Sequence, residues 1–242
     1  METTSSAAPA ADFRALGLPE ALLTVLAELG YDTPTAIQQL ALPPLLAGRD
    51  LIGQSKTGSG KTAAFAISLL MGVDAGRREP QALVLCPTRD LCTQVAGEIR
   101  KLGRYQPNLQ VLTISGGKPF KPQALALARG VHVVVATPGR LLDHMTRGGP
   151  AVAGVRTLVL DEADRMLDMG FREEISEILR QMPARLQTSL FSATFDKVLL
   201  DLSARYQRDP QRVAVEEAPA AIEQWRFEVS DAQRLPALMA LL

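Results

Sequence analysis

Two segments of the chain combine residue types that bind phosphate groups and metal ions. They are SKTGSGKT, residues 55–62, and LVLDEAD, residues 158–164. In a glycine-rich turn of the first kind, backbone N–H groups cradle phosphate oxygens, the lysine reaches the β- and γ-phosphates, and the last hydroxyl ligates Mg²⁺. We therefore expect Lys61 to bind the phosphates of a nucleoside triphosphate and Thr62 to hold the metal.

The second segment is an apolar run that ends in two carboxylates, as a buried strand does when it delivers acidic groups to its end. We expect Asp161 to hold Mg²⁺ through its water shell, and Glu162 to orient or deprotonate the attacking water. Lys61, Asp161 and Glu162 are the predicted catalytic residues. Either segment alone is a weak or moderate signal, whereas the two together in this order are a strong one.

The remaining residues of the glycine-rich turn are also expected to contact the nucleotide. Gly58 and Gly60 supply the permissive backbone that the turn needs, and Thr57 and Ser59 add hydrogen-bond donors. Ser55 breaks the strict G-x-x-x-x-G-K-[ST] signature, because the general pattern has glycine at that position. Serine is small, so we expect the turn to survive, with room for a side-chain hydrogen bond.

Short apolar runs alternate with helical patterns from Leu51 onward. Most runs are rich in Val, Ile and Leu without alternation, which is typical of parallel strands covered on both faces. Strands joined by helices indicate βαβ units, so we predict an α/β fold with a mostly parallel sheet and helices on both faces. The expected strands are 51–54, 82–86, 111–115, 131–136, 157–160, 188–191 and 212–215, and the expected helices include 18–29, 35–46, 62–71, 91–102, 140–147, 173–181 and 199–207.

A polar or glycine-containing turn follows each of the first six expected strands. In chain order these turns are KTGSGKT, PTRD, GG, TPGR, DEAD and SAT. The carboxyl ends of parallel strands lie along one edge of the sheet, where open α/β sheets bind ligands. We therefore expect all six turns to line one face of the molecule. The order of the strands within the sheet does not follow from the sequence.

The two ends of the chain differ from this core. Residues 1–11, rich in Thr, Ser, Ala and Pro, are expected to be a disordered tail, and residues 12–217 one domain. Residues 218–224 resemble a linker, and residues 230–242 begin a new amphipathic pattern without a partner. We therefore predict that residues 218–242 are a linker and the start of a missing second domain.

Composition narrows the class of protein. Of the 242 residues, 47% are hydrophobic and 21% are charged, as in ordinary soluble globular proteins. The formal net charge is zero, so any nucleic-acid binding must come from local groups. Cys86 and Cys92 lack metal-site spacing and are expected to be reduced packing residues, which suits a cytoplasmic protein. No apolar stretch approaches ~18 residues, so we expect no membrane span.

The order of these turns, together with GYDTPTAIQ at residues 30–38, resembles the N-terminal RecA-like domain of the DEAD-box RNA helicase family. The resemblance covers the chain from Phe13 to about Gln224. Stretches such as ALVLCPTRDL and VLDEADRMLDMGF are similar to the bacterial DbpA subfamily in particular. The resemblance implies a RecA-like P-loop NTPase domain that binds ATP, Mg²⁺ and RNA, and that works with a second RecA-like domain.

Within this family a glutamine amide reads adenine, and Gln38 occupies that position. An amide offers both a donor and an acceptor, which match N7 and the N6 amino group of adenine, whereas guanine presents two acceptors there. The resemblance therefore implies ATP rather than GTP. It also places Phe13 near the base and Tyr31 and Thr33 in the nucleotide-binding segment. The alternative is that Gln38 and Phe13 only pack the N-terminal helices.

The resemblance assigns a coupling role to the acidic turn and to the SAT turn. In the family the hydroxyls of the latter hydrogen-bond the former and connect ATP hydrolysis to domain movement. The corresponding residues are Asp164, Ser192, Ala193 and Thr194. The alternative is that Ser192 and Thr194 cap the helix that follows, and both interpretations can hold together.

The turns assigned to RNA combine helix starts with close-approach glycines. Helix N-termini bind phosphates through free N–H groups, and such contacts position the strand without reading its sequence. We expect Thr88 and Thr137 to cap helices and Arg89 and Arg140 to add positive charge, although exposed arginines can also be solvated surface residues. The predicted RNA-binding residues are Pro87, Thr88, Arg89, Gly116, Gly117, Thr137, Pro138, Gly139 and Arg140.

The main hypothesis is the N-terminal domain of an ATP-dependent RNA helicase that contacts single-stranded or duplex RNA, by analogy ribosomal RNA during ribosome assembly. In the family the arginine fingers belong to the second domain, so this chain alone is expected to bind ATP weakly and to hydrolyse it very slowly. The alternatives are a nucleotide-binding or protein-docking module without turnover, and a DNA-dependent superfamily 2 helicase.

Overall fold

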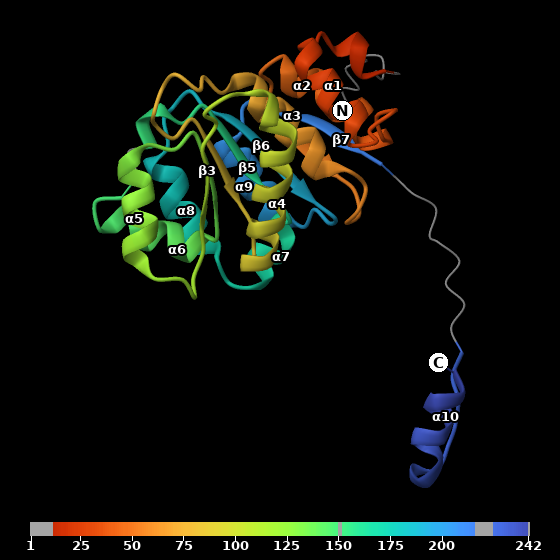
Figure 1. Cartoon of the computed structure of the whole chain (residues 1–242). Helices are drawn as coiled ribbons and strands as arrows, with labels where there is room; N and C mark the ends of the chain where they lie inside the picture. Colours follow the sequence, from red (N-terminus) through yellow and green to blue (C-terminus); the bar gives the residue numbers. More distant parts are fainter. Residues whose placement is uncertain (1–11, 150–151, 216–224, 242) are drawn as a thin grey trace.

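The structure is a computed structural model that describes residues 12–149, 152–215 and 225–241 (Figure 1). The predicted tail over residues 1–11 and the predicted linker over residues 218–224 lie outside the described residues. The described residues form an α/β domain followed by a short C-terminal segment.

The domain is built on one sheet whose paired strands are all parallel. The sheet has seven strands in the order β3-β4-β2-β5-β6-β1-β7. Each predicted strand is present, with bounds that differ by no more than two residues from those expected. The strands are β1 (Leu51–Gln54), β2 (Ala82–Leu85), β3 (Val111–Ile114), β4 (Val133–Ala136), β5 (Thr157–Leu160), β6 (Gln187–Ser192) and β7 (Gln211–Ala214).

Helices connect the strands and cover the sheet (Figure 1). The sequence pattern singles out most of them but not α5 or α7. The α-helices are α1 (Glu20–Glu28), α2 (Ala36–Leu46), α3 (Lys61–Gly72), α4 (Arg89–Leu102), α5 (Phe120–Arg129), α6 (Pro138–Thr146), α7 (Ala163–Asp168), α8 (Arg172–Gln181), α9 (Lys197–Tyr206) and α10 (Arg234–Leu241). Short 3₁₀ helices cover Phe13–Leu16, Gly103–Tyr105, Val152–Gly154 and Asp231–Gln233.

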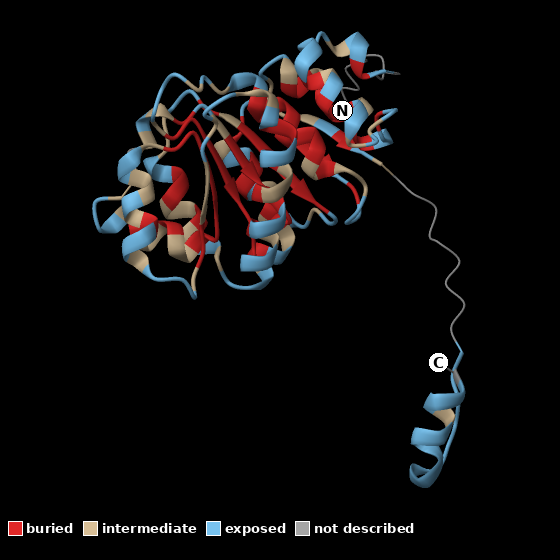
Figure 2. Cartoon of the chain, viewed as in Figure 1, coloured by how far each residue is buried: buried red, intermediate tan, exposed pale blue. Residues whose placement is uncertain are grey.

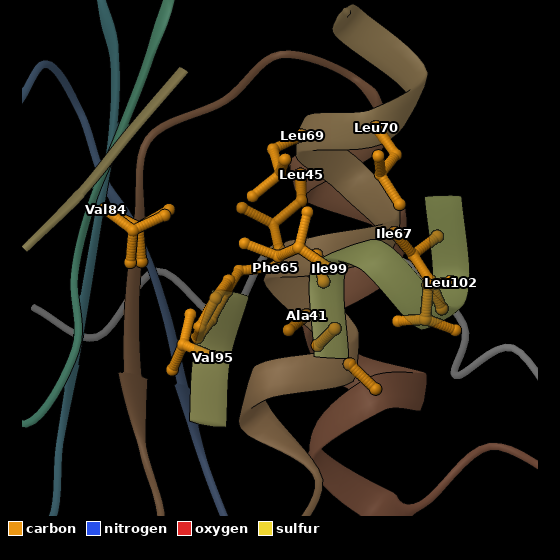
Figure 3. Packing of buried hydrophobic residues seen from close by; sticks show 14 of the residues in the cluster. Ala41, Leu45, Phe65, Ile67, Leu69, Leu70, Val84, Val95, Ile99 and Leu102 are labelled. Carbon is orange, nitrogen blue, oxygen red and sulfur yellow. The ribbon is translucent and has the colours of Figure 1, made fainter. Parts of the chain in front are cut away.

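Two hydrophobic cores lie on the two faces of the sheet, which confirms the prediction of helices on both sides. Strand β2 shows how they are divided, because Ala82 and Val84 point into one core and Leu83 and Leu85 into the other. Helices α1 to α4 fill the first core, whose central side chains are shown in Figure 3. Helices α6 to α9 fill the second, and Figure 2 shows the buried residues concentrated along the sheet and the inner helix faces.

A glycine in β1 allows one large aromatic residue to pack in the first core. The rings of Phe65 on α3 and Phe191 on β6 lie with their centroids 5.5 Å apart. A Cβ atom at Gly53 would come within 2.6 Å of the Phe191 ring. Because two carbon atoms cannot approach so closely, any side chain at Gly53 would displace Phe191 and with it the support beneath α3, the helix that begins at Lys61.

The strand order divides the polar turns into two groups along the carboxyl edge. The turns after β3, β4 and β2 begin near Gly116, Thr137 and Pro87, and these three strands are neighbours. The turns after β5, β6 and β1 carry the acidic segment, the SAT segment and the glycine-rich segment on the other half of the edge. The predicted RNA-binding and nucleotide-binding residues therefore lie side by side rather than intermixed.

The C-terminal segment, residues 225–241, is exposed and contains α10. Several large apolar side chains are exposed on it, among them Trp225, Phe227, Leu235, Leu238 and Met239. The start of a further domain in this segment stays a prediction. Within the described parts of the chain, no helix has the length and apolar character required to cross a membrane.

Candidate functional site

The glycine-rich turn between β1 and α3 forms a compact loop that holds Lys61 in place. Gly58 and Gly60 adopt positive φ angles of 81° and 97°, a conformation that favours glycine. The Lys61 ammonium group is buried and donates a hydrogen bond of 2.7 Å to the Ser55 carbonyl oxygen. The Ser55 and Ser59 hydroxyls lie 2.8 Å apart and hydrogen-bond each other. The turn therefore tolerates serine at its first position, and the hydrogen bond of that serine to Ser59 stabilises the loop.

A cleft of about 320 Å³ opens between this loop and the end of β5. Lys61 and Thr62 line it together with Asp161 and Glu162, so the structure brings the basic and acidic segments together as expected. Thr57, Gly58 and Gly60 also line the cleft, and Tyr31 reaches it from the N-terminal segment. Leu91, Gln94 and Glu98 of α4 complete the wall, and these three were not predicted from the sequence.

Asp161 has the environment of a metal ligand. Its side chain is almost fully buried, and within the described chain its Oδ1 atom has no hydrogen-bond partner. Burial raises the pKa of Asp161 to about 7, and the positive charge of Lys61 only partly opposes this. A buried carboxylate oxygen without a partner suits a hard cation such as Mg²⁺, which prefers oxygen ligands. The residues present therefore fit Mg²⁺, with Asp161 and Thr62 as the groups that would hold it.

Glu162 immediately precedes α7, as its N-cap residue, in a conformation that is unusual for a residue with a side chain. Its φ angle is +51°, and its carboxylate accepts a hydrogen bond of 2.5 Å from Arg165 Nη1. A left-handed conformation outside glycine costs free energy and is found most often at functional sites. No sequence pattern pointed to Arg165, because an acid followed by a base three residues later usually forms a plain surface pair.

The acidic turn and the SAT turn are joined by direct hydrogen bonds. Asp164 Oδ2 accepts hydrogen bonds from Ala193 N at 3.2 Å, from Thr194 N at 3.0 Å and from Thr194 Oγ1 at 2.9 Å, while the Asp164 N–H donates to Ser192 Oγ at 3.3 Å. Burial alone would raise the pKa of Asp164, but the hydrogen bonds from Ser192 and Thr194 outweigh burial and lower it.

The alternative for the SAT turn, that Ser192 and Thr194 cap the next helix, is wrong. Helix α9 begins only at Lys197, and its cap is Asp196, whose carboxylate accepts a hydrogen bond of 2.8 Å from Leu199 N. The two hydroxyls instead connect β6 to the start of α7, as the coupling interpretation requires.

Gln38 ties the start of α2 to the glycine-rich turn. Its side-chain oxygen accepts a hydrogen bond of 2.9 Å from Thr35 N, and its Nε2 donates to the Gly60 carbonyl oxygen at 3.1 Å. Thr35, which the sequence analysis did not assign to the site, donates from its hydroxyl to the Ser59 carbonyl oxygen at 2.8 Å. The fully buried Gln38 amide keeps one N–H and one lone pair for a further partner. Packing and base reading are therefore compatible at this residue.

The other residues assigned to the adenine side are more dispersed. Phe13 is buried in the first hydrophobic core, which supports its alternative packing role. Tyr31 lines the cleft and donates a hydrogen bond of 2.6 Å to Glu98 Oε1, and burial together with Glu98 raises the pKa of the Tyr31 hydroxyl. Thr33 is exposed and makes no side-chain hydrogen bond to any residue that the structure describes.

On the other half of the edge, Arg89 and the glycine pair after β3 face each other. Thr88 caps α4, because its Oγ1 accepts a hydrogen bond of 3.2 Å from Leu91 N. The exposed Arg89 guanidinium forms no ion pair or hydrogen bond with another described residue. A Cβ atom at Gly116 would lie 3.7 Å from this guanidinium, and one at Gly117 would collide with it. The glycines therefore leave room for a cation at the backbone of this turn.

Arg140 differs from the expectation, because its guanidinium is already bound within the protein. It donates to Gln123 Oε1 at 3.1 Å and to the Lys118 carbonyl oxygen at 2.8 Å, and it pairs with Asp143 at 3.3 Å. Arg140 thus fastens the turn after β3 to α6. Thr137 also differs, because it precedes α6 in an extended conformation but its hydroxyl makes no capping hydrogen bond. The predicted capping role of Thr137 is wrong.

Pro138 and Gly139 occupy the first turn of α6, as expected. Pro138 is the first helical residue, where its missing N–H leaves no intrahelical hydrogen bond unmade. Gln123, which the sequence analysis did not assign to the site, lies beside this turn. The buried Gln123 amide donates to the Ser115 carbonyl oxygen at 3.1 Å and accepts from Arg140. A lone glutamine in a helical pattern gives no sign of such a contact.

Replacing Gln38 by Ala is expected to have two separable effects. Loss of both amide hydrogen bonds should lower the free energy of unfolding by about 1–2 kcal/mol, measured by urea denaturation. ATP affinity should fall further than GTP affinity, measured by calorimetric titration. Gln39→Ala is the matched control, because the Gln39 side chain donates a hydrogen bond of 2.9 Å to the Pro34 carbonyl oxygen and, among the described residues, does not bond the glycine-rich turn. Equal losses of ATP and GTP affinity would reject base reading by Gln38.

Comparison with known proteins gives consistent results. A family model described as DEAD/DEAH box helicase matches residues 35–202. The ATP-dependent RNA helicase DbpA of Escherichia coli is 51% identical over 227 residues, covering 93% of this chain and 50% of that protein. The ATP-dependent RNA helicase DeaD of Mycobacterium tuberculosis is 45% identical over 219 residues, covering 90% of this chain and 39% of that protein.

Among solved structures, a DEAD box protein from Methanococcus jannaschii superposes with a TM-score of 0.83 at 38% identity, covering 97% of this chain and 64% of that one. The resemblance drawn from the sequence, and its RecA-like fold, are confirmed. The chain spans half or less of the length of these curated relatives.

Proposed function

The chain belongs to the DEAD/DEAH box helicase family, and we propose that it is the ATP- and RNA-binding half of an ATP-dependent RNA helicase. One observation carries the proposal. Lys61, Asp161 and Glu162 share a cleft, and Asp161 Oδ1 has no hydrogen-bond partner among the described residues. The edge that holds this cleft continues directly into the turns that carry Arg89 and Gly116. A nucleotide and a nucleic-acid backbone would therefore bind as neighbours.

In the nucleotide half, the backbone of the glycine-rich turn and Lys61 bind the β- and γ-phosphates of ATP, and Gln38 reads the adenine. Asp161 and Thr62 would hold Mg²⁺, which would supply positive charge to the phosphate oxygens. Glu162, held beside the cleft by Arg165, orients the attacking water and accepts its proton. Release of Lys61 from the Ser55 carbonyl oxygen frees its ammonium group for the phosphates.

On the RNA-binding part of the edge, the N-terminus of α4 and the exposed Arg89 guanidinium bind backbone phosphates beside Gly116 and Gly117. Arg140 acts mainly by positioning this turn, because its hydrogen bonds to Gln123 and Lys118 occupy its guanidinium. Such contacts bind RNA without reading its sequence, which suits a chain with a formal net charge of zero and only local positive groups. We propose ribosomal RNA as the target, by analogy within the family.

The remaining steps of ATP hydrolysis and domain movement involve a second domain. Residues 218–242 are proposed to be the linker to, and the start of, a second RecA-like domain. That domain would supply the arginine finger, a group worth about 10³–10⁵ in rate. The contacts of Asp164 with Ser192 and Thr194 are proposed to connect ATP hydrolysis to domain movement. Residues 1–242 alone should therefore bind ATP weakly and turn it over very slowly.

The test is a comparison of ATP hydrolysis by residues 1–242 with that of a longer protein that includes the second domain, each with RNA, with DNA of the same sequence and without nucleic acid. We expect stimulation by RNA in the longer protein alone. Equal stimulation by DNA would favour a DNA-dependent helicase, and absence of turnover in both proteins would favour a binding module without catalysis.

A further inference from the structure

A second cavity lies at the amino-terminal edge of the sheet, opposite the edge that holds the candidate cleft. It has a volume of about 440 Å³ and is formed by the loops that precede β2, β3 and β4. These strands start level with one another, because Val133 pairs with both Ala82 and Val111. The loops are also bonded to each other, since the Gln81 N–H donates to the His132 carbonyl oxygen at 2.8 Å. The cavity is thus part of the folded framework.

Two arginines give this cavity a positive charge that the neighbouring residues do not neutralise. Arg78 and Arg129 both line it, and neither guanidinium forms an ion pair or hydrogen bond with any residue in the described ranges. Two acids lie nearby, but neither pairs with Arg78 or Arg129 within the described ranges: Glu79 pairs with Arg77, and Asp74 Oδ1 accepts a hydrogen bond of 2.9 Å from Gly76 N. The cavity therefore offers two cationic, forked donor groups to a ligand.

His132 contributes a third donor from the wall of the cavity. Its ring is buried, and its Nδ1 accepts a hydrogen bond of 2.9 Å from Gln110 N. The proton of the neutral ring must therefore be on Nε2, which has no hydrogen-bond partner among the described atoms. Burial is the main cause that lowers the pKa of His132; the Ala75 backbone and the Asp74 charge oppose it, and the charge of Arg78 acts in the same direction as burial. The ring is thus neutral and presents an unsatisfied N–H group.

A glycine brings the two arginines to the same cavity. Gly130 follows Arg129 at the end of α5 and has a φ angle of +94°. A Cβ atom at this position would lie 2.6 Å from Arg78 Cβ and 3.0 Å from the Arg78 carbonyl oxygen. Only glycine therefore allows the turn before β4 to pack against the backbone of Arg78, which fixes the spacing of the two side chains.

We propose that this cavity binds a phosphate group through Arg78, Arg129 and His132. Guanidinium groups match the geometry of phosphate oxygens and bind them with paired hydrogen bonds, and an unsatisfied N–H group gains an acceptor in the process. This cavity is separate from the proposed ATP- and RNA-binding residues at the carboxyl edge, so the proposal goes beyond the proposed function. The phosphate could belong to a small anion or to the backbone of an RNA strand that extends around the domain.

The chain offers a direct probe, because it contains only two histidines, His132 and His144. We would follow the Hε1 resonance of His132 by NMR at pH 8 while titrating inorganic phosphate in one arm and a short single-stranded RNA in the other, with ionic strength held constant by NaCl. We expect a saturable shift of His132 with at least one probe. The affinity should fall roughly tenfold or more in Arg78→Gln and in Arg129→Gln.

Two control variants separate this site from nonspecific binding and from the cleft. Arg77→Gln removes a neighbouring charge that is paired with Glu79, and Lys61→Ala weakens phosphate binding at the glycine-rich turn. Both should leave the His132 response unchanged. A response to RNA alone, with the same dependence on Arg78 and Arg129, would identify the polymer as the phosphate source. The proposal is overturned if neither probe shifts His132, if both arginine variants respond like the unmodified chain, or if Lys61→Ala abolishes the shift.

Discussion

Replacing Glu162 with Gln is expected to lower RNA-stimulated ATP hydrolysis by about 10²–10⁴-fold, with ATP affinity nearly unchanged. Glutamine has almost the same shape as glutamate but cannot accept a proton from the attacking water. The carboxylate is held at the cleft by Arg165, whereas the phosphates are bound by other groups. The measurement is steady-state turnover in a protein that includes the second RecA-like domain, combined with equilibrium titration of ATP.

Glu173→Gln provides the matched control, because Glu173 is an exposed acid in the first turn of α8. It removes the same charge at a distance from the cleft and should leave turnover within about twofold of the unmodified protein. Retained turnover in Glu162→Gln would remove Glu162 from the mechanism. An equal loss of turnover in Glu173→Gln would show that the effect reflects net charge and not proton transfer.

Replacing Asp161 with Asn is expected to stabilise the free protein at alkaline pH while weakening Mg²⁺–ATP binding. The pKa of Asp161 rises from its ordinary value of 3.8 to about 7 in the folded state, chiefly because the carboxylate is buried. At a pH between these two pKa values, Asp161 has lost its proton in the unfolded chain and retains it in the folded chain. The free energy of unfolding therefore falls as the pH rises from about 4 to about 7, and this contribution is constant above that range.

Asparagine resembles the protonated carboxyl group and does not titrate. In urea denaturation with a chelator present, Asp161→Asn should therefore differ little from the unmodified chain near pH 4.5. Near pH 8 it should be more stable by about 2–4 kcal/mol. Asp168→Asn, an exposed site on α7, should show no such trend. A stability difference that does not grow with pH would contradict the raised pKa that burial gives to the Asp161 carboxyl group.

The fold was largely predictable because each strand is a short apolar run that stops at a polar turn. Runs such as 82–86 and 157–160 carry their own boundaries, and parallel strands necessarily place Pro87 and Asp161 on the same edge. The strand order was not predictable, because a right-handed crossover can pass over one strand or several without any local change in sequence. Only the structure therefore shows that the predicted nucleotide-binding turns and the predicted RNA-binding turns lie side by side.

The site was less completely predictable than the fold, because the partner of a side chain depends on distant segments. Lys61 and Asp161 could be assigned from their own motifs. The link from Thr35 to the Ser59 carbonyl oxygen joins segments 24 residues apart in the sequence, and neither residue signals the other. Arg140 has the sequence context of a free cation, yet Gln123 on α5 and the Lys118 carbonyl oxygen in the turn after β3 occupy its guanidinium.

Calorimetric titration of Mg²⁺–ATP into residues 1–242 and into the Lys61→Ala variant tests the assignment of the carboxyl-edge cleft most directly. Because the Lys61 ammonium group is the buried cation of the cleft, we predict saturable binding to the unmodified chain and a loss of at least about tenfold in affinity for the variant. Equal affinities for the two proteins, or no detectable binding to the unmodified chain, would contradict the presence of an ATP site between Lys61 and Asp161.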